Sequence, residues 1–363
     1  MKKERMDKRL AALRELMASR HLEAVFLYGR ENSRYLSDFS GTTSEILLTQ
    51  DEAWIYVDSR YKEQAQEQCL SYTVKQVPGP LREEIYDYVR RHRIRRLGYE
   101  GEALSARDYL ALHKALPDVE LENISQDLAQ LRQIKDAEEL DYIRKAVLIA
   151  DEAFAETWPC LHAGMSELEA AALLEYNMKK RGAAGPSFET ICASGLRGAM
   201  PHGVASEKIL EDGDMVTMDF GCIYKGYCSD ITRSFFIGHS NEKLIDIYNV
   251  VLKAQINAEQ NIKAGMTGQE GDRFARSIIE EAGYGPYFGH GLGHSLGLEI
   301  HELPSLSPKW DKPLPAGVLL TVEPGIYVPG LGGVRIEDSC LLHEDGLEIL
   351  TSATKELLIT GRS

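Results

Sequence analysis

Two acidic residues in the segment MDFGCIYKGYCSDITRSF have the spacing of a cation-binding pair. Lys225-Gly226 is a hairpin turn signal between two apolar segments. A two-residue loop there aligns Asp219 with Thr232 and places Asp219 and Asp230 on one face as diagonal neighbours, about 7–8 Å apart at the backbone. Carboxylates that close repel each other unless a positive charge lies between them. We therefore predict a bound cation; two unrelated surface acids remain the alternative, and an odd loop length would break the pairing.

Three histidines lie within the glycine-rich segment FGHGLGHSLGLEIHE. His290 and His294 are four residues apart, which on a helix would chelate a metal. The interleaved glycines oppose a helix, because each costs about 1 kcal/mol relative to alanine. A loop that lets the backbone approach a ligand closely fits better. With His301 also nearby, we predict a site rather than three structural histidines.

A further pair of acids lies in TVEPGIYVPGLGGVRIEDS. Glu323 ends an apolar strand before a Pro-Gly turn, and Glu337 lies in a second strand. Alternation in that second strand puts Arg335 and Glu337 on one face. A Glu337–Arg335 ion pair is therefore the structural alternative to a functional role.

The four acids and one imidazole together fit two divalent cations. One dication does not balance four carboxylates, whereas two do. An oxygen-rich ligand set suits Mn²⁺, and a single histidine also admits Co²⁺ or Zn²⁺. Two ions roughly 3.5–4 Å apart can share a hydroxide and stabilise a tetrahedral intermediate. The chemistry that we predict is hydrolysis.

An internal repeat supplies the elements that must position these residues. AGMSELEAAALLEYNMKKRGA (163–183) aligns with AGMTGQEGDRFARSIIEEAGY (264–284), each with a helix N-cap (Ser166 or Thr267) and a closing glycine. Downstream, VTMDFG aligns with LTVEPG, so that each half contributes two acids. We predict a pseudo-symmetric site between the halves; chance similarity is the alternative.

The first third of the chain alternates between helix and strand patterns, which predicts an α/β layer structure. We interpret 119–135 as the link to a second domain that begins with a long amphipathic helix over 136–156. The predicted domains are residues 1–128 and 136–363. The strands expected in the first are 24–28, 46–49, 54–57, 73–77 and 96–100, and the helices are 5–20, a short one around 35, 61–68, 81–93 and 105–116.

Composition excludes some partners. The formal net charge is −15, which argues against nucleic acid and against an anionic membrane surface. The N-terminal stretch MKKERMDKRLAALRELM lacks the apolar core of a signal peptide. The six cysteines form no CxxC pair. We expect a cytoplasmic protein with reduced thiols.

These motifs resemble those of the pita-bread metallopeptidases of family M24, in particular the Xaa-Pro aminopeptidase and prolidase group. The resemblance covers nearly the whole chain and rests on MDFGCIYKGYCSDITR, HGLGHSLGLEIHE and VEPGIYVPGLGGVRIED. It implies an α/β, creatinase-like N-terminal domain and an α+β, duplicated pita-bread catalytic domain. It also implies a homodimer that acts on short peptides with proline at the second position. The metal ligands that it implies are Asp219, Asp230, His294, Glu323 and Glu337.

The resemblance also assigns roles. Asp230 and Glu337 would bridge two ions, with a metal-bound hydroxide attacking the scissile carbonyl. Glu323 would also move protons as general base and then acid. The remaining expected catalytic or substrate-binding residues are His202, His290, His301 and, lining the site, Arg335.

One departure from the dipeptidase pattern HExPR bears on substrate length. This chain reads HELPS, with Ser305 where an arginine would bind the C-terminal carboxylate of a dipeptide. The sequence therefore favours an Xaa-Pro aminopeptidase over a strict Xaa-Pro dipeptidase (prolidase). A metal-free creatinase-like hydrolase, a methionine aminopeptidase and a non-catalytic pita-bread peptide-binding module are the remoter alternatives.

Overall fold

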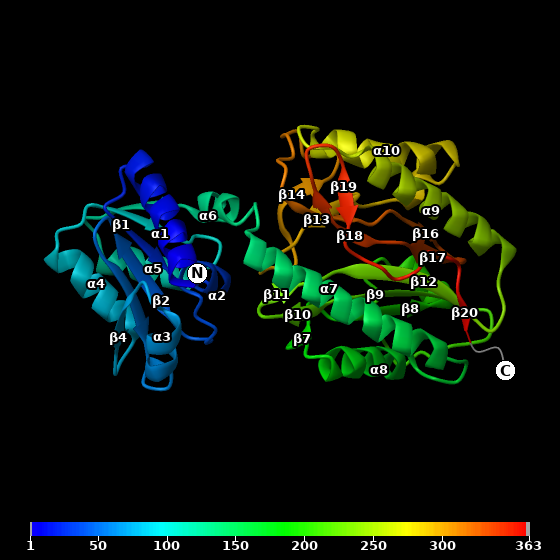
Figure 1. The fold of residues 1–363 in the computed structure, drawn as a ribbon, viewed down its shortest axis with the longest axis horizontal. Helices are drawn as coiled ribbons and strands as arrows, with labels where there is room; N and C mark the ends of the chain where they lie inside the picture. Colours follow the sequence, from blue (N-terminus) through cyan, green and yellow to red (C-terminus); the bar gives the residue numbers. More distant parts are fainter. Residues whose placement is uncertain (1, 361–363) are drawn as a thin grey trace. The chain divides into compact units, whose positions relative to one another are not determined.

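The computed structural model describes residues 2–360, which form two compact units that divide between Arg132 and Gln133 (Figure 1). The division lies four residues beyond the predicted end of the first domain at residue 128, because the end of the expected link is itself folded. Each unit has its own apolar core.

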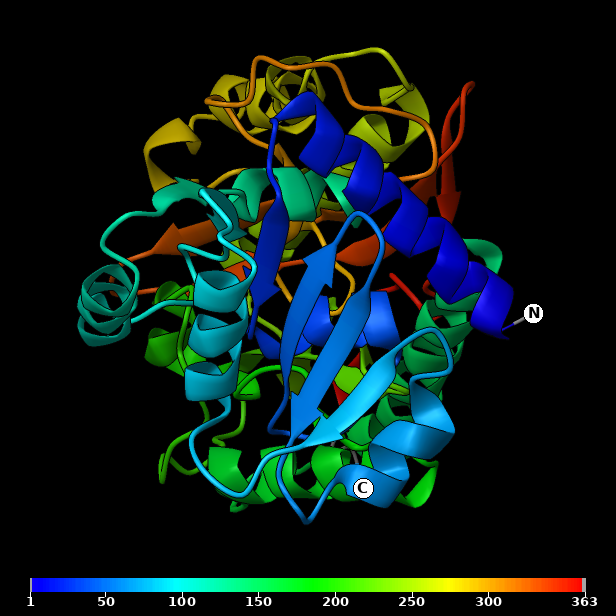
Figure 2. The ribbon, with the colours of Figure 1, turned by 90° about the vertical axis from the view of Figure 1, so that its left-hand side faces the viewer.

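The first unit is built around a six-stranded sheet of order β4-β3-β2-β1-β5-β6, onto which Figure 2 looks. Strand β1 is apolar and fully buried between antiparallel β2 and parallel β5, as expected for the centre of a sheet covered on both faces. The elements are α1 (Lys2–Ser19), β1 (Ala24–Leu27), α2 (Arg30–Ser37), β2 (Glu45–Thr49), β3 (Ala53–Val57), α3 (Lys62–Gln68), β4 (Thr73–Gln76), α4 (Leu81–Arg91), β5 (Arg96–Tyr99), α5 (Ala106–Ala115), β6 (Glu120–Asn123) and α6 (Ser125–Leu131).

The segment interpreted as the link between the domains, 119–135, does contain the boundary between the two units, but most of it is folded into the first unit. Residues 120–123 form edge strand β6, parallel to β5, and residues 125–131 form helix α6. The sequence ELEN shows too little apolar alternation to signal a strand, so only pairing with β5 defines it.

The second unit holds its strands between two helix pairs, α7–α8 and α9–α10 (Figure 1). The predicted helix 136–156 is α7, in which Ile143, Val147 and Ala150 are buried and Leu140 is half-buried. The elements are α7 (Ala137–Thr157), α8 (Glu167–Lys180), β7 (Gly185–Pro186), β8 (Ile191–Ser194), β9 (Met215–Phe220), β10 (Cys222–Tyr224), β11 (Tyr227–Cys228), β12 (Ile231–Ile237), α9 (Glu242–Asn261), α10 (Gly268–Glu281), β13 (Gly293–Ser295), β14 (Glu302–Leu306), β15 (Leu319–Val322), β16 (Gly325–Val328), β17 (Gly332–Arg335), β18 (Asp338–Leu342), β19 (Leu347–Ile349) and β20 (Ile359–Thr360), with 3₁₀ turns η1 (Trp158–Cys160), η2 (Gly195–Ala199) and η3 (Gly285–Tyr287).

The duplication in the sequence corresponds to two similar halves of this unit. Helices α8 and α10 both begin at a capping box, in which Ser166 or Thr267 accepts from the backbone of the glutamate three residues on. In one apolar cluster, side chains of α7 and α8 pack against those of β9 and β12. In the other, side chains of α9 and α10 pack against those of β15 and β18. Strands β9 and β12 and strands β15 and β18 form the antiparallel pairs that carry the acids.

Within residues 2–360, no helix combines the length and the apolar character that a bilayer crossing requires.

Candidate active site

The second unit contains a cavity of about 450 Å³ whose wall includes all nine residues singled out in the sequence. They come from both halves of the unit and from segments up to 135 residues apart in the chain, so only the fold brings them together. They are His202, Asp219, Asp230, His290, His294, His301, Glu323, Arg335 and Glu337.

The first pair of acids lies on the predicted hairpin. Thr232 faces Asp219 across β9 and β12, in the register expected from a two-residue turn. Lys225 and Gly226 both have positive φ, 50° and 89°, which is the turn geometry that matches the twist of a hairpin. The prediction of this pairing is confirmed.

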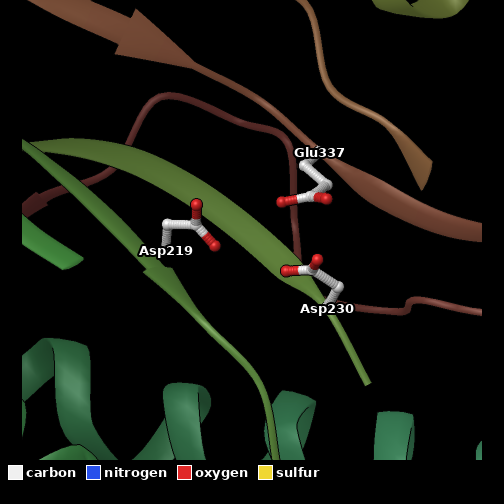
Figure 3. A group of neighbouring side chains, drawn as sticks. All are labelled: Asp219, Asp230 and Glu337. Carbon is white, nitrogen blue, oxygen red and sulfur yellow. The ribbon is translucent and has the colours of Figure 1, made fainter. Parts of the chain in front are cut away.

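Glu337 joins these two acids from the other half of the unit. Its backbone N–H donates to the Thr232 carbonyl (3.1 Å), and the Thr232 hydroxyl donates to Glu337 Oε2 (2.7 Å). Carboxylate oxygens of Asp219, Asp230 and Glu337 all lie within 4.8 Å of one another, and the three side chains converge (Figure 3). The hydrogen bonds to Thr232 thus hold an acid of the second half against the hairpin of the first.

His294 reaches the cluster on the short strand β13. Added to Gly293, a Cβ atom would meet the Thr321 carbonyl oxygen at 2.0 Å, so glycine is required for this close approach to β15. His294 Nδ1 lies 3.0 Å from the Ser295 carbonyl, which makes Nδ1 the donor and leaves Nε2 free to bind a cation. That Nε2 lies 3.5 Å from Asp230 Oδ2 and 3.4 Å from Glu323 Oε1.

The electrostatics of the cluster require added positive charge. Burial raises the pKa of Asp230 and of Glu337, and the neighbouring carboxylates raise both further. Burial raises the pKa of Glu323 to about 7, against the attraction of Arg335. Burial also lowers the pKa of His294, which keeps its imidazole neutral. Neutral imidazole and crowded carboxylates are the protonation states that bound cations would stabilise.

Unsatisfied atoms point to the same conclusion. Asp219 Oδ1 and Glu337 Oε1 are buried and accept no hydrogen bond from any residue that the structure describes. Buried carboxylate oxygens without partners are costly, and cation ligation removes that cost. The residues present therefore fit divalent metal ions.

Arg335 is fixed from four sides, and its ionic partner is not the one considered from the sequence. The guanidinium pairs with Asp219 Oδ2 (2.5 Å) rather than with Glu337. It also donates to the Thr232 hydroxyl (3.0 Å), the Tyr327 hydroxyl (2.7 Å) and the Pro201 carbonyl (3.1 Å). Arg335 thus supports one carboxylate of the cluster and the loop that contains Pro201.

The three remaining histidines differ in environment. His290 Nε2 lies 2.9 Å from the Tyr327 hydroxyl, and burial together with the charge of Arg335 lowers the pKa of His290 to about 4. The His301 ring lies edge-on to His294, with centroids 4.3 Å apart. His202 and His301 are exposed side chains in the cavity wall.

Tyr327 was missed in the sequence. It is buried and connects Arg335 to His290. Its position follows from the β16–β17 register, which pairs Gly325 with Arg335 and Tyr327 with Gly333, so that Tyr327 and Arg335 are diagonal neighbours on one face. The two strands of this hairpin could be recognised in the sequence, but the pairing of their residues could not be derived because the Gly-rich loop between them has no defined length in the sequence. Apolar side chains of the wall were also missed: Phe188, Ile191, Val204 and Ile300.

Comparison with known sequences places this site in a family. Residues 141–344 match metallopeptidase family M24, and residues 9–134 match the creatinase/prolidase N-terminal domain. The chain belongs to metallopeptidase family M24. An M24 chain of this kind has both a creatinase-like first domain and a pita-bread catalytic domain, as the sequence predicted. Enzymatic function is therefore supported over a binding module.

This M24 metallopeptidase is similar along nearly its whole length to several peptidases, of which three illustrate the range. It is 43% identical to an Xaa-Pro dipeptidase of Pyrococcus furiosus, over 97% of this chain and 100% of that protein. The solved structure of an Xaa-Pro dipeptidase from Bacillus anthracis shares 43% identity at a TM-score of 0.94, covering 98% of this chain and 99% of that one. An X-Pro aminopeptidase from Thermotoga maritima shares 39% identity at a TM-score of 0.90, covering 96% and 99%.

Proposed function

We propose that this M24 metallopeptidase is an Xaa-Pro dipeptidase that hydrolyses the bond between the first residue and a following proline. The observation that carries the proposal is the similarity, over at least 97% of both chains, to Xaa-Pro dipeptidases. The sequence alone favoured an aminopeptidase because of Ser305, and these relatives favour the dipeptidase alternative instead.

The ligand set supports two divalent ions, with Mn²⁺ preferred because four of the five ligands are carboxylates. When bound, the ions would activate a water molecule and polarise the scissile carbonyl. In this proposal Asp219, Asp230, His294, Glu323 and Glu337 are the residues that would hold the ions. Glu323 would also act as general base and then general acid, moving a proton from the attacking water to the leaving nitrogen.

The rest of the wall supports recognition of the substrate. Apolar side chains of the wall give the proline ring a surface that excludes water, and Phe188 is the largest of them. His202 and His301 are exposed imidazoles in the same wall and supply polar contacts to the peptide. Arg335 orients Asp219 and the Pro201 carbonyl.

A second candidate function, Xaa-Pro aminopeptidase activity on longer peptides, is favoured by one observation. Position 305 carries no cation, and its serine hydroxyl lies 3.2 Å from the Ser307 hydroxyl. Among the described residues of the wall, the only arginine or lysine is Arg335, whose guanidinium is bound to Asp219. A dipeptide's C-terminal carboxylate would therefore depend on the histidines.

The test compares hydrolysis of Ala-Pro and Ala-Pro-Ala by Mn²⁺-loaded protein, with EDTA-treated protein as the control. Cleavage of Ala-Pro alone, abolished by EDTA, is expected. Cleavage of the tripeptide to free alanine would establish the aminopeptidase instead, and metal-dependent cleavage of neither would refute both.

Position 305 offers a matched pair of variants. If a missing cation limits dipeptide binding, Ser305→Arg should lower the KM for Ala-Pro and leave the KM for Ala-Pro-Ala unchanged. Ser305→Gln adds bulk without charge and should leave the KM values of both peptides unchanged. An equal response of both variants would remove Ser305 from the argument about substrate length.

We also propose a cytoplasmic homodimer. All six cysteines are free thiols and five are buried, which supports a reducing compartment. Light scattering on the purified protein tests the dimer, and fractionation tests the compartment.

A further inference from the structure

A buried carboxylate outside the metal cluster binds the segment that carries His202. Glu167 is fully buried in the first turn of α8. Its Oε1 accepts from the Ser194 N–H and hydroxyl (both 2.8 Å). Its Oε2 accepts from the Ser206 N–H (3.1 Å) and hydroxyl (2.7 Å) and forms an ion pair with Arg197. A carboxylate has about four lone-pair sites, so these donors use its full capacity.

All of these donors belong to one segment, residues 194–206, which we name the His202 loop. Pro201, His202 and Val204 of this loop line the cavity, whereas Glu167 does not. Arg197 also donates to the Val204 carbonyl (2.9 Å). Its side chain therefore connects Glu167 to the part of the loop that borders the cavity.

The loop is held on its other side by the active site. Arg335 donates to the Pro201 carbonyl (3.1 Å). A Cβ atom on Gly198 would meet the Gly333 nitrogen at 2.9 Å, so the loop packs backbone to backbone on β17. His202 thus lies between two anchors, one at Glu167 and one on β17.

At the position that corresponds to Glu167, the second half of the unit has no carboxylate. In the repeat, Glu167 corresponds to Gly268, where a Cβ atom would meet the Ser305 carbonyl oxygen at 2.1 Å. There the backbone of the facing segment packs directly on the helix start. The Glu167 side chain therefore occupies a space that has no counterpart at Gly268, where the backbones are in direct contact. Its hydrogen bonds are made to the loop of the first half.

We propose that Glu167 is a positioning residue that fixes the His202 loop, and thereby sets how tightly the peptide substrate binds without affecting the metal ions. The inference rests on the proposed peptidase function. Glu167 reaches the substrate only through the loop, whereas the five metal ligands lie on strands and turns that Glu167 does not contact.

The first experiment compares Glu167→Gln with Glu169→Gln. The amide at 167 places an NH₂ group against donors that need an acceptor, which loosens the loop. Glu169 lies in the same helical turn but accepts only from Ser166, so its substitution tests the helix start alone. For Glu167→Gln we expect KM for the cleaved peptide to rise roughly tenfold, the effect of losing a buried charge-assisted hydrogen bond. We expect kcat and calorimetric Mn²⁺ affinity to stay within about threefold of wild type, a change of less than about 1 kcal/mol.

The second experiment is a double-mutant cycle with His202→Ala. If Glu167 acts through His202, Glu167→Gln should add little to the KM of His202→Ala. Additive effects would overturn the proposal, as would an unchanged KM in a folded Glu167→Gln protein or a parallel loss of Mn²⁺ affinity. Should Glu167→Gln fail to fold, Ser206→Ala removes one donor and should raise KM in the same direction by less.

Hydrogen exchange separates this inference from the proposed function. Amides of residues 194–206 should exchange faster in Glu167→Gln than in wild type, and not in Glu169→Gln. That result would establish the anchor even if wild-type protein cleaved neither peptide, an outcome that would count against the proposed function alone. Unchanged exchange would refute the anchor whatever the activity.

Discussion

The two halves of the catalytic unit share their scaffold and differ in what the scaffold holds. In both halves, the N–H of a glycine before the helix donates to the carbonyl of a leucine in the facing segment. These hydrogen bonds, Gly164 to Leu210 and Gly265 to Leu314, are both 2.9 Å long. Both helices then start at a capping box. After the capping residue the halves diverge, with Glu167 in one and Gly268 in the other.

The acids diverge as well. Asp219 and Asp230 are diagonal neighbours on one hairpin. Glu323 and Glu337 lie where the pairing passes from β15–β18 to β16–β17. Each pair also depends on the opposite half, because Arg335 pairs with Asp219 and Thr232 binds Glu337. The two halves therefore share the hydrogen bonds and helix caps that determine the backbone. The cluster of acids, in contrast, is formed by side chains from both halves together.

The largest expected effect comes from removing one acid of either half. Asp230→Asn and Glu337→Gln should each lower kcat/KM by more than about a hundredfold, since loss of an outer partner of a ligand already costs roughly 10–100-fold. Both should also lower the bound Mn²⁺ measured by elemental analysis. Asp246→Asn, an exposed acid of α9, is the control and should change neither. A mild effect at one position only would mean that the halves do not share the site.

The next prediction concerns pH and metal removal. The pKa of Glu323 is about 7 in the folded protein, against about 4.3 in an unfolded chain. The folded state therefore binds more protons between these values, and its stability falls as pH rises through them. For Glu323 alone the loss is on the order of 3 kcal/mol, and Asp230 and Glu337, whose pKa values are also raised, add to it.

Thermal melts of EDTA-treated protein from pH 4 to pH 8 check this. Tm of the metal-free protein should fall with pH more steeply than Tm of the protein saturated with Mn²⁺, because the cluster acids add to the fall only when no cation is bound. Glu323→Gln should flatten the metal-free curve. Equal pH dependence of Tm with and without Mn²⁺ would contradict the predicted repulsion among the cluster carboxylates.

A smaller effect tests the position at which the halves diverge. Gly268→Ala puts a Cβ atom 2.1 Å from the Ser305 carbonyl oxygen, and Ser305 pairs with His294 across β13 and β14. Overpacking of this kind costs roughly 1–3 kcal/mol, measured by urea unfolding. Calorimetric Mn²⁺ affinity should fall with it. Gly346→Ala, where nothing lies within 4 Å of the added atom, is the control.

The smallest effects should be equal between the halves. Ser166→Ala and Thr267→Ala each remove the acceptor of a capping box and should cost about 1 kcal/mol of unfolding free energy. Ser105→Ala, which removes the cap of α5 in the first unit, gives the reference value. If the unfolding free energies lost in Ser166→Ala and Thr267→Ala differed by more than the loss in Ser105→Ala, the two scaffolds would not be equivalent.

Local patterns were sufficient for much of this fold. The turn at Lys225-Gly226 defined the partner of Asp219, because hairpin register depends on a few adjacent residues. Capping residues marked the starts of α8 and α10 for the same reason. Strand β6 escaped notice, since a short polar edge strand exists only through its pairing with β5.

The sequence by itself identified nine residues that the fold gathers in one cavity, their two matching halves and the family. Only the tertiary structure decided that Arg335 pairs with Asp219, that Tyr327 connects it to His290, and that Glu167 holds the His202 loop. The reason is physical. Periodicity and capping depend on neighbours a few residues apart, whereas the partner of a buried charge is whichever group the fold brings within hydrogen-bond distance, and its sequence separation leaves no local trace.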